Sequence, residues 1–311
     1  NIDEIIISVG GKQVLFNALL SSINPGDEVI IPSPYWVSYP DMVALAGGKP
    51  IIVEGKSKNN FKIMPEDIKD KISIKTKWII INSPSNPTGS SYSKKELKNI
   101  GDLLINYKNI FIMSDDIYEK IIYDDNKFYT IAEVVPELKD RILTVNGVSK
   151  AYAMTGWRIG YAGGPKTLIS AMAKLQSQST SNPSSISQAA ALAALEGPED
   201  FLSERNAQFK IRRNMVVEKL NKCKGIHCLL PTGAFYVYPS CKGLIGKQTP
   251  AGQIINNSIG FSSYLLEEVG VAVVPGSAFG ADFFFRISYA TSDSILVEAC
   301  NRIQKACDQL I

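Results

Sequence analysis

Short apolar runs alternate with amphipathic stretches along the first two-thirds of the chain. Seven runs are apolar on both faces and bounded by turn residues, at residues 5–9, 28–31, 50–53, 78–82, 110–113, 142–146 and 159–162. Between them lie amphipathic stretches of helical length, at residues 12–22, 37–46, 94–107 and 165–178. Such runs are typical of buried strands in a parallel sheet. The alternation therefore predicts an α/β fold, with a mostly parallel seven-stranded sheet flanked by helices on both faces.

The pattern changes after about Ser185. One helical stretch ends at Gly197 and Pro198, and a longer, charge-rich helix is predicted over residues 199–222. The rest of the chain reads as strands at residues 234–238, 271–274 and 284–288, a surface loop at 240–260 and a closing helix at 292–310. We therefore expect a large domain over residues 1–197 and a smaller C-terminal α+β domain over residues 198–311.

Composition and charge narrow the possible functions. The 311 residues are 45% hydrophobic and 20% charged, which is ordinary for a soluble globular enzyme. A net charge of +3 without a long basic run argues against nucleic acid or an anionic membrane as partner, and no apolar stretch reaches the length of a membrane span. Five scattered cysteines predict reduced thiols in the cytoplasm, and a single histidine, His227, argues against a metal site.

Two segments place polar groups directly after predicted strands. Gly10, Gly11 and Lys12 join a strand to a helix, where glycine allows close backbone approach and free N–H groups face an anion such as phosphate; plain packing is the alternative. Asn86 lies in the loop 82–89, which two prolines and a glycine constrain and which is otherwise a simple turn. Because ligands bind at the carboxyl ends of strands in open α/β sheets, both segments are candidates for a site.

Adjacent carboxylates follow the predicted strand at residues 110–113. Asp115 and Asp116 are costly neighbours unless a cation is paired with one of them, and a protonated pyridine nitrogen is such a cation. The alternative is that both carboxylates are solvated in a loop. Tyr118 follows two residues later.

Three basic residues extend the set. Lys150 follows the strand at residues 142–146, and a buried lysine has a depressed pKa and forms imines. Arg158 follows eight positions later and offers a fork suited to phosphate. Arg286 lies within an apolar, aromatic strand, where burial requires an anion: a substrate carboxylate or a structural salt bridge.

These segments, in this order, resemble the class I aminotransferases of the pyridoxal-phosphate (PLP) fold type I, with a particular likeness to the bacterial aspartate aminotransferases. The resemblance covers essentially the whole chain and rests on the runs GGKQVLFN, SPYWVSYP, NSPSNPTG, SDDIY, SKAYAMTGWRIGY, PTGAFYVYP, GVAVVPGSAFG and FRISYA. So many motifs in register make it specific.

The resemblance implies roles for five cofactor-facing residues. Lys150 is similar to the lysine that holds PLP as a Schiff base and then moves the substrate proton. Asp115 resembles the carboxylate that keeps the pyridine nitrogen protonated, so that the ring accepts electrons. Tyr118 and Asn86 resemble the pair that binds the ring 3′-oxygen, and Trp36 resembles the aromatic residue stacked on the ring.

The resemblance also implies anion-binding residues. The phosphate would be held by Gly10, Gly11, Lys12, Ser149 and Arg158. Arg286 would bind the substrate α-carboxylate beside Asn86 and Trp36. Lys12 resembles the lysine that reaches the side-chain carboxylate of a dicarboxylic substrate.

The activity expected on this basis is a ping-pong amino-group transfer between L-aspartate or L-glutamate and 2-oxo acids, namely 2-oxoglutarate and oxaloacetate, by a cytoplasmic homodimer. Alternatives are an aminotransferase for prephenate or aromatic substrates, a β-lyase, or a PLP-binding module that is inactive in truncated form. Comparing the turnover of aspartate, phenylalanine and arogenate distinguishes the enzymes from one another.

Two departures from the family pattern stand out. The chain opens on Asn1, almost directly on a strand, whereas the family carries an N-terminal segment that supplies part of the small domain, a substrate loop and a tyrosine that reaches the partner subunit's phosphate. We expect such a segment to be disordered or removed. Asp116 stands where relatives often have Glu, which we expect to be tolerated.

Overall fold

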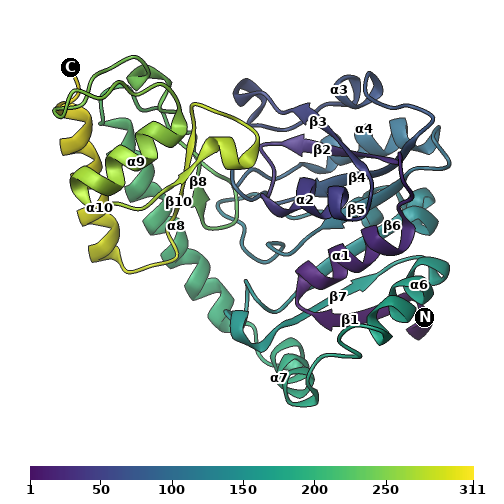
Figure 1. The fold of residues 1–311 in the computed structure, drawn as a ribbon. Helices are drawn as coiled ribbons and strands as arrows, with labels where there is room; N and C mark the ends of the chain where they lie inside the picture. Colours follow the sequence, from purple (N-terminus) through teal and green to yellow (C-terminus); the bar gives the residue numbers. More distant parts are fainter.

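A seven-stranded sheet forms the larger part of the computed structural model, which describes residues 1–311 (Figure 1). Its strands are β1 (Ile5–Val9), β2 (Glu28–Ser33), β3 (Lys49–Glu54), β4 (Thr76–Asn82), β5 (Phe111–Asp115), β6 (Ile142–Gly147) and β7 (Ile159–Gly163). They lie in the order β1-β7-β6-β5-β4-β2-β3, and β7 alone runs against its neighbours. The predicted mostly parallel seven-stranded sheet is confirmed.

Helices cover both faces of this sheet. They are α1 (Gly11–Ser22), α2 (Ser38–Leu45), α3 (Pro65–Lys69), α4 (Lys94–Ile105), α5 (Ile131–Val134) and α6 (Lys166–Ser177). Alternate residues of β4 serve the two faces: Ile80 belongs to the core that contains α1, α2 and α6, and Ile79 and Ile81 belong to the core that contains α3, α4 and α5. This burial on both faces explains why the strands read as continuous apolar runs.

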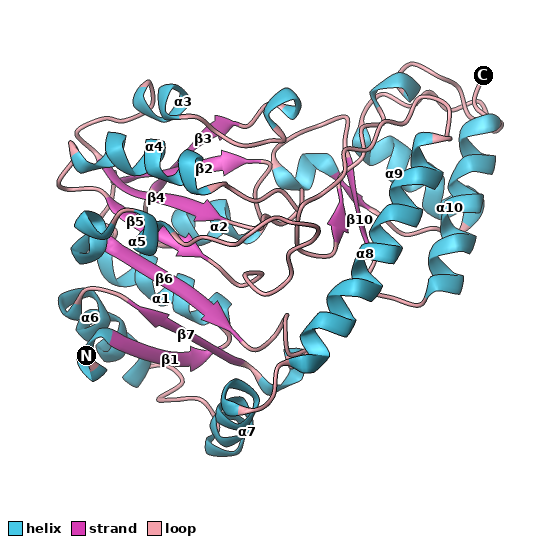
Figure 2. Ribbon diagram, turned by 180° about the vertical axis from the view of Figure 1, so that it is seen from behind, coloured by secondary structure: helices cyan, strands magenta, loops and turns pink.

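The C-terminal part of the chain builds a second, smaller sheet. The long helix α8 (Asp200–Asn221) leads into it, and its three strands are β8 (Tyr236–Val237), β9 (Val274–Pro275) and β10 (Phe285–Ser288), in the antiparallel order β8-β10-β9. Two further helices, α9 (Ser258–Val269) and α10 (Asp293–Asp308), pack beside α8 (Figure 2). All five cysteines are buried and unpaired here.

Three local predictions for this part were wrong. The predicted loop at residues 240–260 holds a short 3-10 helix, Lys242–Leu244, and the fully buried first residue of α9, Ser258. The sequence analysis missed α9 altogether. The strands expected at residues 234–238 and 271–274 are only two residues long, because pairing with β10 extends over two residues on each side.

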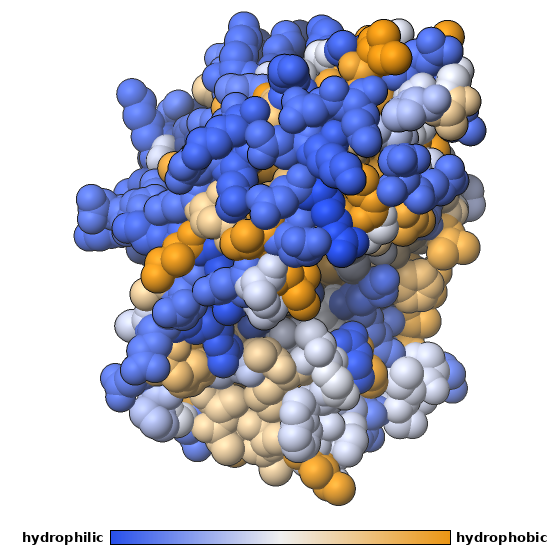
Figure 3. Space-filling view, turned by 90° about the vertical axis from the view of Figure 1, so that its left-hand side faces the viewer, coloured by the Kyte–Doolittle hydropathy of each residue, from blue (hydrophilic) through white to orange (hydrophobic).

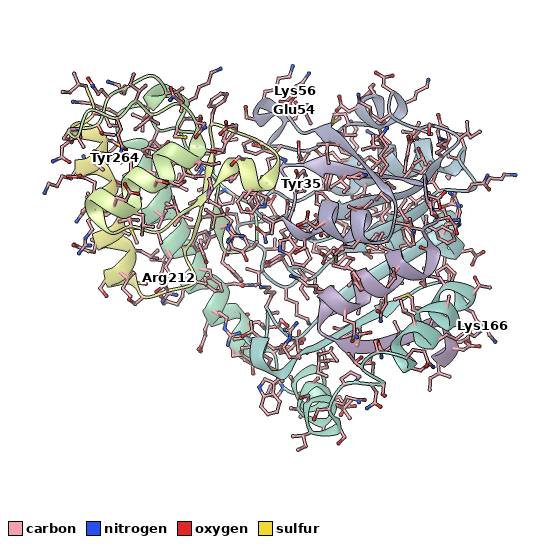
Figure 4. All side chains as sticks on the ribbon, viewed as in Figure 1. Tyr35, Glu54, Lys56, Lys166, Arg212 and Tyr264 are labelled. Atoms are coloured by element: carbon pink, nitrogen blue, oxygen red, sulfur yellow. The ribbon has the colours of Figure 1, made fainter.

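The two parts of the molecule share a core, to which Tyr118, Ile121 and Tyr123 of the larger part belong, and they also meet at Tyr35. The backbone N–H of Tyr35 donates to the carbonyl of Phe279 at 3.0 Å, and a Cβ on Gly280 would lie 2.4 Å from the Tyr35 ring. Figure 4 labels Tyr35 at this junction. The glycine therefore permits the close approach that brings the C-terminal part up to the sheet.

None of the helices is long and apolar enough to cross a lipid bilayer.

Candidate active site

A cavity of about 170 Å³ opens at the sheet edge where the parallel strands end. Its lining residues are Gly11, Lys12, Leu15, Trp36, Tyr39, Asn82, Asn86, Asp115, Ile117, Tyr118, Ser149, Lys150, Thr155 and Arg158. All the predicted site residues are among them except Gly10 and Arg286, and each of these two contacts a lining residue. The structure thus brings the eleven predicted residues together at one place.

The strand directions explain this convergence. Asn82 and Asp115 are the last residues of β4 and β5, and Gly10 directly follows β1. The connection between β6 and β7 leaves and re-enters the sheet at the same edge, because β7 is reversed. Lys150 and Arg158 lie in that connection, so they join the cavity although they are not on parallel strand ends.

The start of α1 forms a tight cradle. Gly10 has a φ of 81°, and a Cβ on it would lie 2.1 Å from Nη2 of Arg158. A Cβ on Gly160 would lie 2.2 Å from the backbone nitrogen of Gly11. The Arg158 guanidinium donates to the carbonyl of Thr155 at 2.9 Å through Nη1 alone, which leaves its other donors free. Backbone N–H groups and a guanidinium at a helix start form a site that fits a phosphate.

Lys150 is half-buried between aromatic rings. Its Nζ lies 5.8 Å from the ring centroid of Tyr118 and 5.7 Å from that of Phe235. Burial lowers the pKa of the Lys150 ammonium, and the positive charge of Arg286 lowers it further. A lower pKa increases the fraction of neutral amine, which is the form that attacks a carbonyl carbon.

Asp115 is held by a residue that the sequence analysis missed. The hydroxyl of Tyr39 donates to Oδ2 of Asp115 at 2.6 Å, and both side chains are buried. Burial raises the pKa of the Asp115 carboxyl, and the Tyr39 hydrogen bond opposes that rise. Tyr39 follows Trp36 by three positions at the start of α2, so helical spacing was the available signal.

The neighbouring carboxylate, Asp116, turns away from this arrangement. Its Oδ1 accepts from the Ser114 hydroxyl at 2.8 Å, and its Oδ2 is buried without a hydrogen-bond partner. Burial raises the pKa of Asp116 to about 7. The two adjacent carboxylates therefore have different environments, and the alternative that both are solvated is wrong.

The side chain of Asn82, at the end of β4, holds the loop that carries Asn86. Oδ1 of Asn82 accepts from the backbone N–H of Asn86 at 2.9 Å, and Nδ2 of Asn82 donates to the carbonyl of Asp115 at 2.8 Å. Asn82 lines the cavity and was not predicted as a site residue. It ties the ends of β4 and β5 to the loop.

Arg286 reaches the cavity from the smaller sheet. Its Nη1 donates to Oδ1 of Asn86 at 2.8 Å, and its guanidinium carbon lies 4.6 Å from the Tyr236 ring centroid and 5.0 Å from that of Phe279. Nε is buried and has no hydrogen-bond partner. A half-buried guanidinium with an unpaired donor fits an incoming carboxylate.

Lys12 lines the cavity beside Trp36. Its Nζ is 4.8 Å from the ring centroid of Trp36, and Trp36 meets Tyr39 edge to face at 5.4 Å. One more unpredicted contact joins the two parts of the molecule: the hydroxyls of Tyr118 and Tyr236 are 2.8 Å apart.

Known proteins are similar to this chain over nearly its whole length. The family model for aminotransferases of class I and II matches residues 1–303. A probable aspartate/prephenate aminotransferase of Rickettsia typhi is 58% identical over 309 residues, which cover 99% of this chain and 77% of that protein. An aspartate aminotransferase of Rhizobium meliloti is 53% identical over 309 residues, which cover 99% of this chain and 75% of that protein.

Solved structures agree with the fold. The crystal structure of the Rhizobium meliloti aspartate aminotransferase superposes with a TM-score of 0.98 at 52% identity, covering 100% of this chain and 78% of that one. The Thermus thermophilus aspartate aminotransferase with maleate gives a TM-score of 0.90 at 40% identity, covering 98% and 76%. The fold is that of the fold type I PLP transferases. With the family model matched along almost every residue, this chain belongs to the class I and II aminotransferases.

Proposed function

We propose that this chain is a PLP-dependent aspartate aminotransferase, which transfers the amino group between L-aspartate or L-glutamate and the 2-oxo acids oxaloacetate and 2-oxoglutarate. The observation that carries the proposal is Arg286: its buried, unpaired Nε belongs to the same site as the Lys150 amine, and the positive charge of Arg286 lowers the pKa of Lys150. A carboxylate bound by Arg286 brings an amino acid to that amine. The names of the relatives from Rickettsia typhi and Rhizobium meliloti support the same activity.

The residues present fit PLP. The cradle at Gly10 and Gly11, with Lys12, Ser149 and Arg158, suits its phosphate, and Asp115 suits its pyridine nitrogen. Tyr118, Asn86 and Trp36 line the same cavity, and in this proposal the first two bind the ring oxygen and the third contacts the ring face. When bound, PLP supplies an electron sink for the substrate Cα.

The protein's own residues supply positioning and proton transfer. With PLP bound, Lys150 would hold the cofactor through its amine, and the same amine would move the substrate Cα proton. Asp115, held by Tyr39, would keep a positive charge on the ring nitrogen of bound PLP. Arg286 fixes the α-carboxylate by its planar fork, so that the Cα proton faces Lys150.

Lys12 sets the preference for a second carboxylate in this proposal. Its ammonium lies over Trp36 in the cavity lining, and a second cation in the same site as Arg286 suits a dicarboxylic substrate. A second candidate is prephenate, because several relatives are named aspartate/prephenate aminotransferases. Initial rates with aspartate, phenylalanine and arogenate decide between them.

We propose further that the chain works as a homodimer. The helix α7 (Ser185–Glu196) projects from the large sheet and exposes Ile186, Leu192 and Leu195 by 73%, 56% and 40%. Figure 3 shows apolar residues gathered at this end of the molecule. Sedimentation analysis of the wild type and of Leu192→Asp tests this: a dimer that the substitution dissociates supports the proposal, and a wild-type monomer contradicts it.

The remaining proposals concern organisation and location. The division into domains at residues 197 and 198 places the boundary between α7 and α8. The five buried, unpaired cysteines support a reducing, cytoplasmic environment. Limited proteolysis near residue 198 tests the boundary.

An absorption spectrum before and after addition of aspartate tests the main proposal. Protein supplied with PLP is expected to show the visible band of the lysine-bound cofactor, and aspartate is expected to replace it with the band of the amine form. A band that ignores aspartate but responds to another amino acid would change the substrate. No band at all would contradict the proposal.

A further inference from the structure

Tyr236 lies between Tyr118 and Arg286, outside the set of residues that line the cavity. Its hydroxyl is 2.8 Å from the Tyr118 hydroxyl, and the Tyr236 ring lies 4.6 Å from the Arg286 guanidinium carbon. Tyr236 is buried and belongs to β8. It therefore contacts one residue assigned to the cofactor and one assigned to the substrate without touching either ligand.

On this basis we infer that Tyr236 is a positioning residue. Its hydroxyl donates a hydrogen bond to Tyr118, and its ring packs against the guanidinium of Arg286 and holds it in place. The inference rests on the proposed function, because only there does Tyr118 bind the cofactor and Arg286 the substrate carboxylate. It adds a residue of the smaller sheet to those that tune the cofactor.

The direction of the hydrogen bond follows from counting protons. Each tyrosine hydroxyl has one hydrogen to donate. If Tyr118 donates its hydrogen to the ring oxygen of PLP, then the 2.8 Å contact is made only when Tyr236 donates to Tyr118. Hydrogen bonds in a chain strengthen one another, so Tyr118 becomes a stronger donor towards the cofactor.

The positive charge of Arg286 acts on both tyrosines of the pair, so the direction of the hydrogen bond rests on the proton count. Burial raises the pKa of Tyr236, whereas its hydrogen bond with Tyr118 and the positive charge of Arg286 act in the opposite sense. A nearby cation makes a phenol a better donor. The other charged groups facing the tyrosine pair are Asp115 and Lys150, which act on Tyr118 from the large sheet.

The first test is a spectrophotometric pH titration of the cofactor's visible band. Removal of the Tyr236 hydroxyl weakens donation by Tyr118 to the ring oxygen, so the proton on the adjacent nitrogen is held more tightly. We expect Tyr236→Phe to move the titration midpoint upward by about half to one pH unit. Tyr264→Phe is the matched control, because Tyr264 is also buried in this part and donates to the carbonyl of Ala306 at 3.0 Å, far from the cavity (Figure 4).

A double substitution tests whether Tyr236 acts through Tyr118. In a Tyr118→Phe background, Tyr236→Phe is expected to cause no additional movement of the midpoint. A further shift of equal size would overturn the inference, and so would an unchanged midpoint in the single Tyr236→Phe variant. Circular dichroism verifies that each variant is folded.

The second test measures how tightly the protein binds a dicarboxylate that lacks an amino group. Binding is followed through the change that the dicarboxylate causes in the visible band. Tyr236→Phe keeps the ring under Arg286 and is expected to bind it like the wild type. Tyr236→Leu removes the ring and is expected to bind it about tenfold more weakly. Equal affinity in both variants contradicts the second half of the inference. Wild-type protein that shows no visible band with PLP contradicts the proposed function itself, which distinguishes the two failures.

Discussion

The two ends of the cavity differ in how fully the chain satisfies their charged groups. At one end, Asp115 accepts from the Tyr39 hydroxyl at 2.6 Å and from the backbone N–H of Ile117 at 3.4 Å. At the other end, Arg286 makes one hydrogen bond, to Asn86, and its buried Nε has none. The Asp115 end is built on the large sheet and is complete within the chain, which suits a partner that stays bound. The Arg286 end comes from the smaller sheet and is unfinished, which suits an anion that enters and leaves.

Lys150 lies between these ends, and its removal is expected to have the largest effect. Lys150→Ala deletes both the attachment point and the base, so kcat for amino-group transfer is expected to fall by more than about 10⁴-fold. Lys166→Ala is the control, because that exposed lysine pairs with Asp3 at the far side of the sheet (Figure 4). Steady-state rates measure both variants, and wild-type turnover in Lys150→Ala would refute the assignment.

The complete end is tested by removing its charge. Asp115→Asn keeps the shape and loses the carboxylate, so the ring nitrogen loses the partner that keeps it protonated. We expect kcat to fall by about 10²- to 10³-fold and the affinity for PLP to weaken. Equilibrium dialysis measures the affinity, and Asp102→Asn on the surface of α4 is the control. An unaffected kcat would show that Asp115 does not face the cofactor.

The buried carboxyl group of Asp116 is expected to make the stability of the protein depend on pH. Burial raises the pKa of Asp116 from 3.8 to about 7, so the folded protein binds more protons than the unfolded chain between these values. This contribution to the free energy of unfolding is present below about pH 4 and is lost as the pH rises through 7. We expect a loss on the order of 2 kcal/mol relative to Asp116→Asn between pH 5 and 8. Urea unfolding of both proteins at the two pH values measures it, and parallel curves would contradict it.

The unfinished end is tested by changing the shape of its cation. Arg286→Lys keeps the positive charge and loses the planar fork, so KM for the amino acid is expected to rise about 10- to 30-fold, with a smaller change in kcat. Arg212→Lys is the control, because Arg212 pairs with Asp293 on the outer surface (Figure 4). Equal KM values for the two variants would mean that Arg286 has only a structural role.

The smallest expected effect concerns selectivity. Lys12→Ala removes the cation above Trp36, so the ratio of kcat/KM for aspartate to that for phenylalanine is expected to fall about 5- to 10-fold. Rates with both amino acids measure it. A ratio that stays the same would assign the dicarboxylate preference to residues elsewhere.

The large sheet was predictable because its signal is local. Each strand has an apolar run of its own, and the residues at strand ends follow from the order of the runs. The reversal of β7 was not predictable, because it depends on pairing with β1, whose residues lie far away in the sequence. Tyr236 was missed for the same reason, because its partner Tyr118 lies 118 positions away, whereas Tyr39 was missed although its spacing from Trp36 was a local signal.

The missed helix α9 had local signals of another kind. The side chain of Asn257 accepts from the backbone N–H of Gly260 at 2.9 Å and begins the helix, and Gly270, with a φ of 66°, ends it. These are standard start and stop residues. The apolar residues of α9 give no clear one-sided stripe. The Gly, Asn and Lys residues before it are typical of loops, so the start of the helix was assigned to a loop.

The spacing of the site residues has a consequence for the order of events on the ribosome. Tyr39 and Asp115 are 76 positions apart, whereas Asn86 and Arg286 are 200 positions apart. Synthesis proceeds from the N-terminus at about 5–20 residues per second, and domains fold as units. The growing polypeptide therefore gains its cofactor-facing end seconds before Arg286 is translated. We expect cofactor that binds in that interval to stabilise the nascent sheet before the protein is able to bind a substrate.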